Sequence, residues 1–160
     1  MRIGGDSITS EFGGAAKVNY LLRTELQPCK DPELECRRAV ETLSKSSSKW
    51  SSKFDAISVL RRIAVRHSRV FCSDALNIMQ LLAEEVSNLR SAISKNALLC
   101  TQDLFRSCGS KSAVSNHLDV LLYPLVVKGL EKNFQGDEAR AALSDLSRFC
   151  ALDRVCKAVV

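Results

Sequence analysis

Residues 84–105, EEVSNLRSAISKNALLCTQDLF, contain the end of one helix, a short polar loop and the whole of the next helix. The apolar residues of the second helix recur at i, i+4, i+7 and i+11, at Ile93, Ala97, Cys100 and Leu104. This spacing predicts one buried face on that helix. In the loop, Ser87 and Asn88 are suitable N-cap residues for the second helix, and Arg90 stands between them and the helix. Two antiparallel helices joined in this way form a helical hairpin.

The same pattern of helix, loop and helix recurs upstream and downstream. Upstream, a helix expected over residues 33–43 is followed by a Ser- and Lys-rich loop and by a second helix over 53–67. Downstream, helices expected over 115–129 and 137–146 flank another polar loop. The loop residues that mark the repeat are 40 and 43 residues apart, at Trp50, Arg90 and Asn133. HEAT and armadillo-type repeats have periods of about 40 to 47 residues. The sequence therefore predicts an all-α fold, a HEAT-repeat (armadillo-like) α-solenoid of antiparallel helix pairs.

The chain of 160 residues is long enough for one domain with its own core. Four of its seven glycines lie within the first fourteen residues. Residues 1–28 are therefore predicted to be a flexible leader, with a short helix at 18–26. We expect one helical-repeat domain over residues 29–160. Its parts are three repeats and a partial last helix, at 31–67, 70–108, 113–148 and 149–160.

Signals for export, membrane insertion, metal binding and catalysis are weak. No apolar segment follows Arg2 as in a secretory signal, and the longest apolar run, 121–127, is too short to span a membrane. The sequence has no G-x-x-x-x-G-K, G-x-G-x-x-G or G-x-S-x-G motif. His67 and His117 form no ligand pair, and His67 is expected to be a partly buried, hydrogen-bonded core residue. We therefore expect a cytosolic protein with no cofactor or metal that is not an enzyme.

The seven cysteines are odd in number, widely scattered and without a C-x-x-C motif. Free cysteines on apolar helix stripes behave as small hydrophobic residues. Three of them are expected on such stripes, namely Cys36, Cys100 and Cys156. We expect the cysteines to be reduced and mostly structural.

Positive charge is concentrated in residues 45–69. Seven basic residues and one acid, Asp55, lie there, so this segment carries +6 compared with +5 for the whole chain. Arg62, Arg66 and Arg69 are spaced i, i+4 and i+7 opposite the apolar stripe, which predicts an exposed basic ridge. Such a ridge is either an ordinary solvated surface or a surface that attracts an acidic partner.

Trp50 is the only tryptophan, and it lies among Ser and Lys residues just before an amphipathic helix. It is either a hydrophobic staple over the start of that helix or an anchor for binding. Tryptophan and arginine are enriched in interface hot spots, and Arg90 and Lys132 lie in the corresponding turns of the next two repeats. Because the loops of a helical solenoid align along one edge, this edge is the predicted binding surface.

Several stretches of the chain resemble TOG domains, first those of the crescerin type and next those of the CLASP family. The stretches are DPE at 31–33, WSSK at 50–53, LRRIAVRHS at 60–68, EEVSNLRS at 84–91 and DLF at 103–105. The likeness covers about residues 31–148. The NLRS stretch together with the tryptophan is its most specific part, because many HEAT proteins share the helical pattern.

The resemblance implies a flat, paddle-like HEAT stack whose loop edge binds αβ-tubulin or microtubules. Such a domain regulates microtubule assembly in the cytoplasm, on the cytoskeleton or, for crescerin-like proteins, in the cilium. By position, the implied contacts are Trp50 and Lys53 in the first loop, Asn88, Arg90 and Ser91 in the second, and Lys132, Asn133 and Phe134 in the third. TOG domains have six HEAT repeats, whereas this chain has about three. It also has Gln135 and Gly136 where TOG domains usually have an aliphatic and a basic residue.

Other functions stay open at this point. The stack can instead be a scaffold that holds a peptide or another protein against its helix faces without binding tubulin. Nucleic acid is a less favoured partner, because Trp50 and Phe54 are the only aromatic residues between Lys45 and His67. No membrane partner is expected, and an enzyme ranks last.

Overall fold

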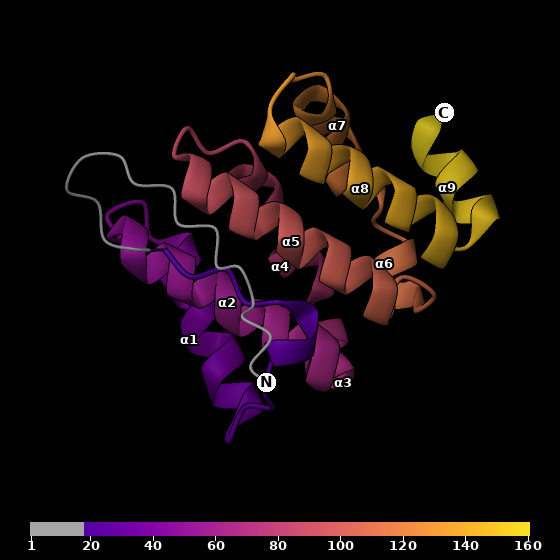
Figure 1. Ribbon diagram of the computed structural model, residues 1–160. Coiled ribbons are helices and arrows are strands. Elements are labelled where there is room, and N and C mark those ends of the chain that lie inside the picture. The colour runs from indigo at the N-terminus through magenta and orange to yellow at the C-terminus, as the bar shows by residue number, and fades with distance from the viewer. Residues whose placement is uncertain (1–17) are drawn as a thin grey trace, which may run out of the picture.

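Helices in two layers form most of residues 18–160, the part of the chain that the computed structural model describes (Figure 1). One layer contains the first helix of each pair: α1 (Pro32–Ser44), α4 (Ala75–Val86) and α7 (Asp119–Gly129). The other layer contains the second helix of each pair: α2 (Trp50–Arg66), α5 (Ser91–Cys108) and α8 (Phe134–Phe149). The described residues contain no strand, so the predicted all-α class is confirmed.

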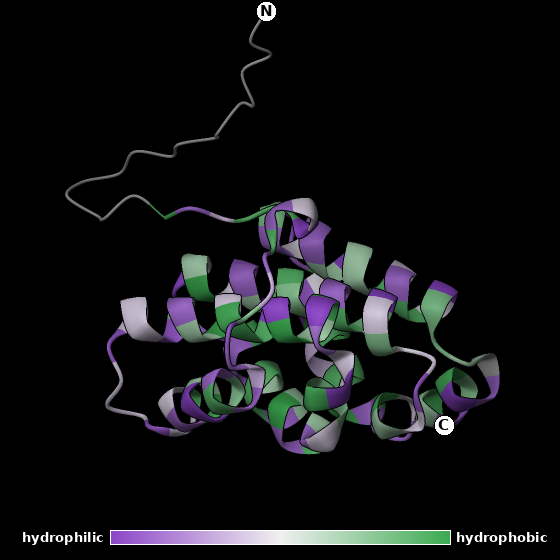
Figure 2. Ribbon diagram, turned by 90° about the horizontal axis from the view of Figure 1, so that it is seen from below, coloured by the Kyte–Doolittle hydropathy of each residue, from purple (hydrophilic) through white to green (hydrophobic). Residues whose placement is uncertain are grey.

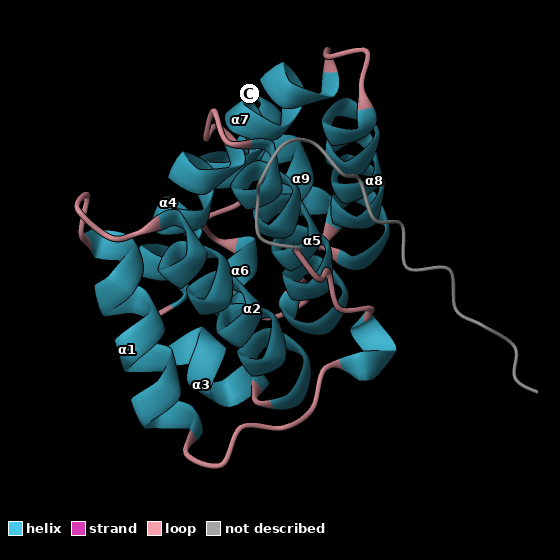
Figure 3. Cartoon of the chain, turned by 60° about the vertical axis from the view of Figure 1, so that its left-hand side comes forward, coloured by secondary structure: helices cyan, strands magenta, loops and turns pink. Residues whose placement is uncertain are grey.

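The three helix pairs stack side by side in chain order. α5 lies between α2 and α8 in one layer, and α4 lies between α1 and α7 in the other. Figure 3 shows the two layers from another side, with α1, α4 and α7 opposite α2, α5 and α8. The helices of each pair are antiparallel, and the three pairs stack in the same orientation. α2, α5 and α8 therefore run in the same direction. This arrangement confirms the predicted HEAT-like solenoid of antiparallel helix pairs.

Shorter helices connect the pairs. α3 (Ser68–Ser73) lies between α2 and α4, α6 (Ser112–Ser115) lies between α5 and α7, and α9 (Leu152–Val159) follows α8. α9 contacts both α7 and α8. Pro124 lies inside α7, which begins five residues earlier at Asp119. Because proline has no N–H to donate, α7 lacks one of its internal hydrogen bonds at that point.

α5 is the central helix of the stack. Twelve of its 18 residues are buried, compared with two of the 11 residues of α7. Its predicted apolar face is fully buried, because Ile93, Ala97, Cys100 and Leu104 are each at most 1% exposed. Burial of a leucine or isoleucine side chain stabilises the fold by about 1.5–3 kcal/mol. Figure 2 shows the two layers, with hydrophobic residues on the sides where they meet.

Several predicted helix starts are wrong. α7 begins at Asp119 and not at residue 115, and α8 begins at Phe134 and not at residue 137. Ser87 and Asn88 do not cap α5, because the N-cap is Arg90 and its side chain makes no capping hydrogen bond. Asn88 instead accepts a hydrogen bond through Oδ1 from the backbone N–H of Arg90, at 2.9 Å. Trp50, which was predicted to lie in a loop, is the first residue of α2. Its ring is therefore held by a helix.

Residues 18–29, called the strap below, run across α2 and α5 before the first helix pair begins. The strap has little regular structure apart from the 3-10 helix η1 (Arg23–Glu25). Leu26 is completely buried. The N–H of Cys29 donates to Nε2 of His67 at 2.9 Å, so His67 is partly buried and hydrogen-bonded, as expected.

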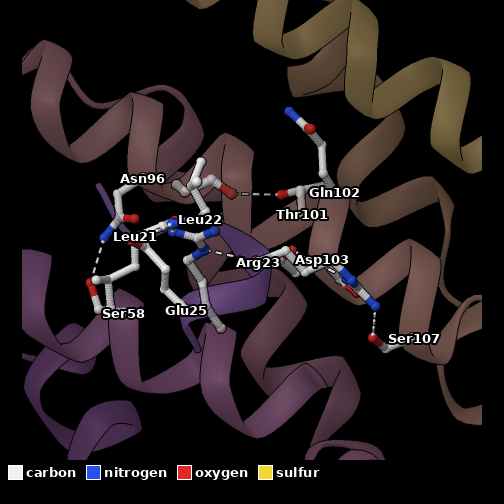
Figure 4. A network of polar contacts seen from close by, with 12 residues as sticks. Leu21, Leu22, Arg23, Glu25, Ser58, Asn96, Thr101, Gln102, Asp103 and Ser107 are labelled. Carbon is white, nitrogen blue, oxygen red and sulfur yellow. Dashed lines mark hydrogen bonds and ion pairs between the residues drawn. The ribbon is translucent and has the colours of Figure 1, made fainter. Parts of the chain in front are cut away.

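A buried ionic network holds the strap against both helices (Figure 4). Asp103 of α5 accepts hydrogen bonds from Nε of Arg61 at 2.7 Å and from Nη1 of Arg23 at 3.2 Å. Arg23 also donates to Oγ of Ser107, and Arg61 also donates to the carbonyl oxygen of Leu21. The Asp103 side chain is 5% exposed. Its two guanidinium partners offset the cost of removing its charge from water.

This arrangement differs from the leader predicted for residues 1–28. Residues 1–17 lie outside the described residues. The helix predicted over 18–26 is replaced by the three residues of η1. Residues 18–28 are held by the network around Asp103 and by the burial of Leu26. The boundaries of the predicted domain, 29–160, and of its repeats stay a prediction.

Candidate functional site

Three loops lie along one edge of the stack, called the loop edge below, where α2, α5 and α8 begin (Figure 1). They join the two helices of each pair and comprise residues 45–49, 87–90 and 130–133. They share one edge because α2, α5 and α8 run in the same direction. All eight residues that the TOG resemblance implies as contacts lie in these loops or in the first turn of the following helix.

Trp50 and Arg90 form a cation–π pair between the first and second repeats. The guanidinium carbon of Arg90 lies 4.7 Å from the centroid of the Trp50 ring. Arg90 is exposed, whereas Trp50 is partly buried and packs against the core. Such a pair contributes about 0.5–1 kcal/mol at an exposed site. Trp50 is the first residue of α2, so it is not placed as a staple residue, which would precede the N-cap. Its role as a binding anchor stays a prediction.

Lys53 is engaged inside the fold. Its ammonium donates to Oε1 of Glu85 at 2.6 Å, and Nδ2 of Asn88 donates to Oε2 of the same carboxylate at 2.7 Å. The side chains of Lys53 and Glu85 are 17% and 4% exposed. Asn88 in turn accepts the backbone N–H of Arg90. Lys53 and Asn88 thus fix the position of the second loop relative to α2.

The third loop is held by its own polar residues. Asn133 caps α8, because its Oδ1 accepts the N–H of Gly136 at 2.9 Å. Its Nδ2 donates to Glu131, whose carboxylate also accepts a hydrogen bond from Lys128. Lys128, and then Asn133, hold the pKa of Glu131 below its usual value. Lys132 is exposed in the loop, and Phe134 is 49% exposed at the first position of α8.

Gln135 and Gly136, which depart from the usual TOG pair, are both buried in the first turn of α8. A Cβ atom on Gly136 would lie 1.9 Å from the backbone oxygen of Glu131. The close turn of the third loop therefore requires glycine, and no basic side chain fits at this position.

Lys95 belongs to the loop edge, although it was not among the predicted contacts. It lies in the second turn of α5, with its ammonium 4.6 Å from the ring centroid of Tyr20 and 5.4 Å from that of Phe134. Phe134 begins α8 as Trp50 begins α2, so each of these aromatic residues has a cation from the second repeat beside it. Lys95 could not be predicted as part of this edge, because Tyr20 lies in the segment predicted to be a leader.

The predicted basic ridge is only partly exposed. Arg61 is buried in its ion pair with Asp103, and Nε of Arg66 donates to the carbonyl oxygen of Leu26 at 2.8 Å. Arg62 is partly buried, whereas Arg69 is exposed. Of the seven basic residues counted between residues 45 and 69, four are exposed, two are partly buried and Arg61 is buried. The predicted exposed ridge is therefore confirmed at Arg66 and Arg69, which are exposed, but not at Arg62.

The cysteine predictions hold for two of three residues. Cys36 and Cys100 are buried, whereas Cys156 is exposed on α9. Burial raises the pKa of the Cys36 thiol to about 11. Within residues 18–160, no cluster of three or more His, Cys, Asp and Glu side chains is placed to hold a metal ion. None of the helices described here is both long enough and apolar enough to cross a membrane.

Comparison with known proteins adds evidence from sequence. The chain is 29% identical over 110 residues to TOG array regulator of axonemal microtubules protein 1 from Homo sapiens, and 28% identical over 109 residues to the Mus musculus protein of that name. The chain is TOG-like. This confirms the resemblance that Trp50 and the NLRS stretch indicated.

The TOG-like match covers 69% and 68% of this chain, but the chain spans only 6% of the length of either relative. No protein-family model and no solved structure matches the chain. The helix pairs of the stack agree with the TOG-like assignment, while the eight contact residues at the loop edge stay a prediction.

Proposed function

We propose that this TOG-like chain binds αβ-tubulin, free or in microtubules, through its loop edge. In this way it regulates microtubule dynamics in the cytoskeleton of the cytoplasm or of the cilium. The observation that carries the proposal is the alignment of Trp50, Arg90 and Phe134, from three successive repeats, along one edge. The names of the two relatives, which describe regulators of axonemal microtubules, support the same partner.

The residues of the loop edge divide into contacts and supports. Trp50, Arg90, Ser91, Lys132 and Phe134 reach the surface and are proposed to contact tubulin directly. Lys53, Asn88 and Asn133 are proposed to act mainly by holding the loops in place, because their polar atoms are engaged within the fold. Tubulin is acidic, so the exposed cations favour association by electrostatic attraction.

Co-elution with soluble αβ-tubulin on a sizing column tests this function. We expect the complete chain to co-elute at low salt and less at moderate salt, since exposed charges are screened. A Trp50→Ala, Arg90→Ala double variant should elute separately from tubulin. Lys111→Ala, which removes an exposed cation that follows α5 at the opposite edge, is the control and should co-elute. A double variant that binds as tightly as the unmodified chain would refute the proposal.

A second candidate function, a protein-binding scaffold that does not bind tubulin, is favoured by one feature of α7. Four large apolar residues of α7 and its C-cap lie at i, i+3, i+4 and i+7, and they are 76%, 44%, 47% and 77% exposed: Tyr123, Val126, Val127 and Leu130. A contiguous exposed apolar stripe often marks a protein interface. If tubulin does not bind, Tyr123→Ser and Leu130→Ser are the variants to compare in a search for another protein partner. Neither nucleic acid nor an enzymatic reaction is proposed.

A further inference from the structure

Lys95 connects the strap, the second repeat and the third repeat at the loop edge. Its ammonium lies against the rings of Tyr20, from the strap, and Phe134, from the start of α8. Tyr20 in turn packs edge-on against Phe54 of α2, with 5.5 Å between ring centroids and 68° between ring planes. Lys95 is therefore positioned by aromatic residues from both sides.

The charge of Lys95 has no internal acidic partner. Among residues 18–160, no carboxylate oxygen lies within 4.0 Å of its ammonium. Lys53 and Lys128, by contrast, are paired with Glu85 and Glu131. Arg90 shares the situation of Lys95, because it also lies on an aromatic ring and makes no ion pair in the described chain. An aromatic face holds a cation without neutralising it, so both charges can act on a partner.

The second repeat supplies both of these cations. Arg90 reaches the first residue of α2, and Lys95 reaches the first residue of α8. The aromatic and cationic surface therefore continues past the second loop to the third repeat and the strap. Phe134, at 49% exposure, leaves part of this second cluster open to a partner.

We propose that Lys95, together with Tyr20 and Phe134, forms a second cationic contact of the loop edge for an acidic surface of tubulin. This inference rests on the proposed tubulin-binding function. Lys95 replaces Lys53 as the lysine that faces the partner, since Lys53 is engaged with Glu85. Tyr20 is a positioning residue, which brings the strap into the binding unit.

The rest of the strap holds Tyr20 in place. Leu26 is completely buried, and Arg23 and Leu21 are bonded to Asp103 and Arg61. Burial raises the pKa of the Tyr20 phenol, so the ring carries no charge at neutral pH. A neutral aromatic ring in a fixed place can orient the lysine side chain, which by itself has four flexible carbons.

The test measures the affinity of the complete chain for αβ-tubulin at two salt concentrations. Lys95→Gln should weaken binding about fivefold at low salt, which corresponds to loss of one cation–π-stabilised charge contact. The loss should shrink at high salt, because the lost interaction is electrostatic. Lys111→Gln is the matched control and should bind as the unmodified chain does. Thermal unfolding followed by circular dichroism checks that every variant is folded.

A double variant tests the positioning role of Tyr20. Tyr20→Leu should weaken binding by a similar factor, and Tyr20→Leu with Lys95→Gln should bind no more weakly than Lys95→Gln alone, because coupled residues are not additive. Additive losses would overturn the role of Tyr20. If Arg90→Ala weakens binding and Lys95→Gln does not, the inference is wrong and the proposed function stands. If the unmodified chain does not bind tubulin, both are wrong.

Discussion

The buried carboxylate of Asp103 should be the most sensitive single polar group in the fold. It is bonded to Arg61, whose side chain is 3% exposed, and to Arg23, whose side chain is 33% exposed. Asp103→Ala would leave the Arg61 charge buried without an acidic partner. Removing one member of a buried ion pair costs about 3–5 kcal/mol. We therefore expect the free energy of unfolding to fall by about that amount.

Urea unfolding measures this effect directly. With a urea dependence of about 2 kcal/mol per molar, the midpoint of Asp103→Ala should fall by about 2 M. The control is Asp137→Ala, because that side chain is 76% exposed and pairs with Arg140, whose side chain is 49% exposed. Its effect should stay within about 0.5 kcal/mol. If the two variants unfold at the same urea concentration with the same slope, the network does not stabilise the fold as argued.

Three further outcomes follow from the packing. Lys53→Met should lower the free energy of unfolding by about 3 kcal/mol, because Glu85 would stay buried without the ammonium group of Lys53. An unchanged midpoint in urea unfolding would contradict this. Gly136→Ala should destabilise the chain by about 1–3 kcal/mol, because the new Cβ meets the Glu131 oxygen; an unchanged melting temperature would show that the loop adapts. The free energy of unfolding should also fall as pH rises from 9.0 to about 11, because of three buried thiols. Burial is the largest cause of their raised pKa in the folded state, so the unfolded chain loses these protons first and is favoured as the pH rises. Thermal melts across that range check this, and the thiols concerned are Cys29, Cys36 and Cys150.

The periodic part of the fold could be predicted from the sequence. The spacing of Ile93, Ala97, Cys100 and Leu104 predicted a buried face because a helix repeats every 3.6 residues, and that face is at most 1% exposed. Trp50, Arg90 and Asn133 are 40 and 43 residues apart, and this regular spacing of the loops predicted three stacked helix pairs. Since the loops of stacked pairs align, the position of the loop edge could also be predicted.

The strap could not be predicted, because its contacts have no period. Arg61 and Arg66 bind the backbone carbonyl oxygens of Leu21 and Leu26, which every residue type possesses. Arg61 was counted with the surface charge although it is buried, because a count of charges does not reveal which of them have a buried partner. The ion pair of Lys53 could not be predicted for the same reason, since its partner Glu85 lies 32 residues away.

The strap also changes how the stack should fold and open. In a helical solenoid each repeat contacts only its neighbours, so end repeats can unfold independently. Arg23, however, is bonded to residues 80 and 84 positions away, in the second repeat. Closing such long loops slows folding and makes the joined segments unfold together. The first two repeats should therefore behave as one cooperative unit, and the third, bound without the strap's ion pairs, should show faster amide hydrogen exchange.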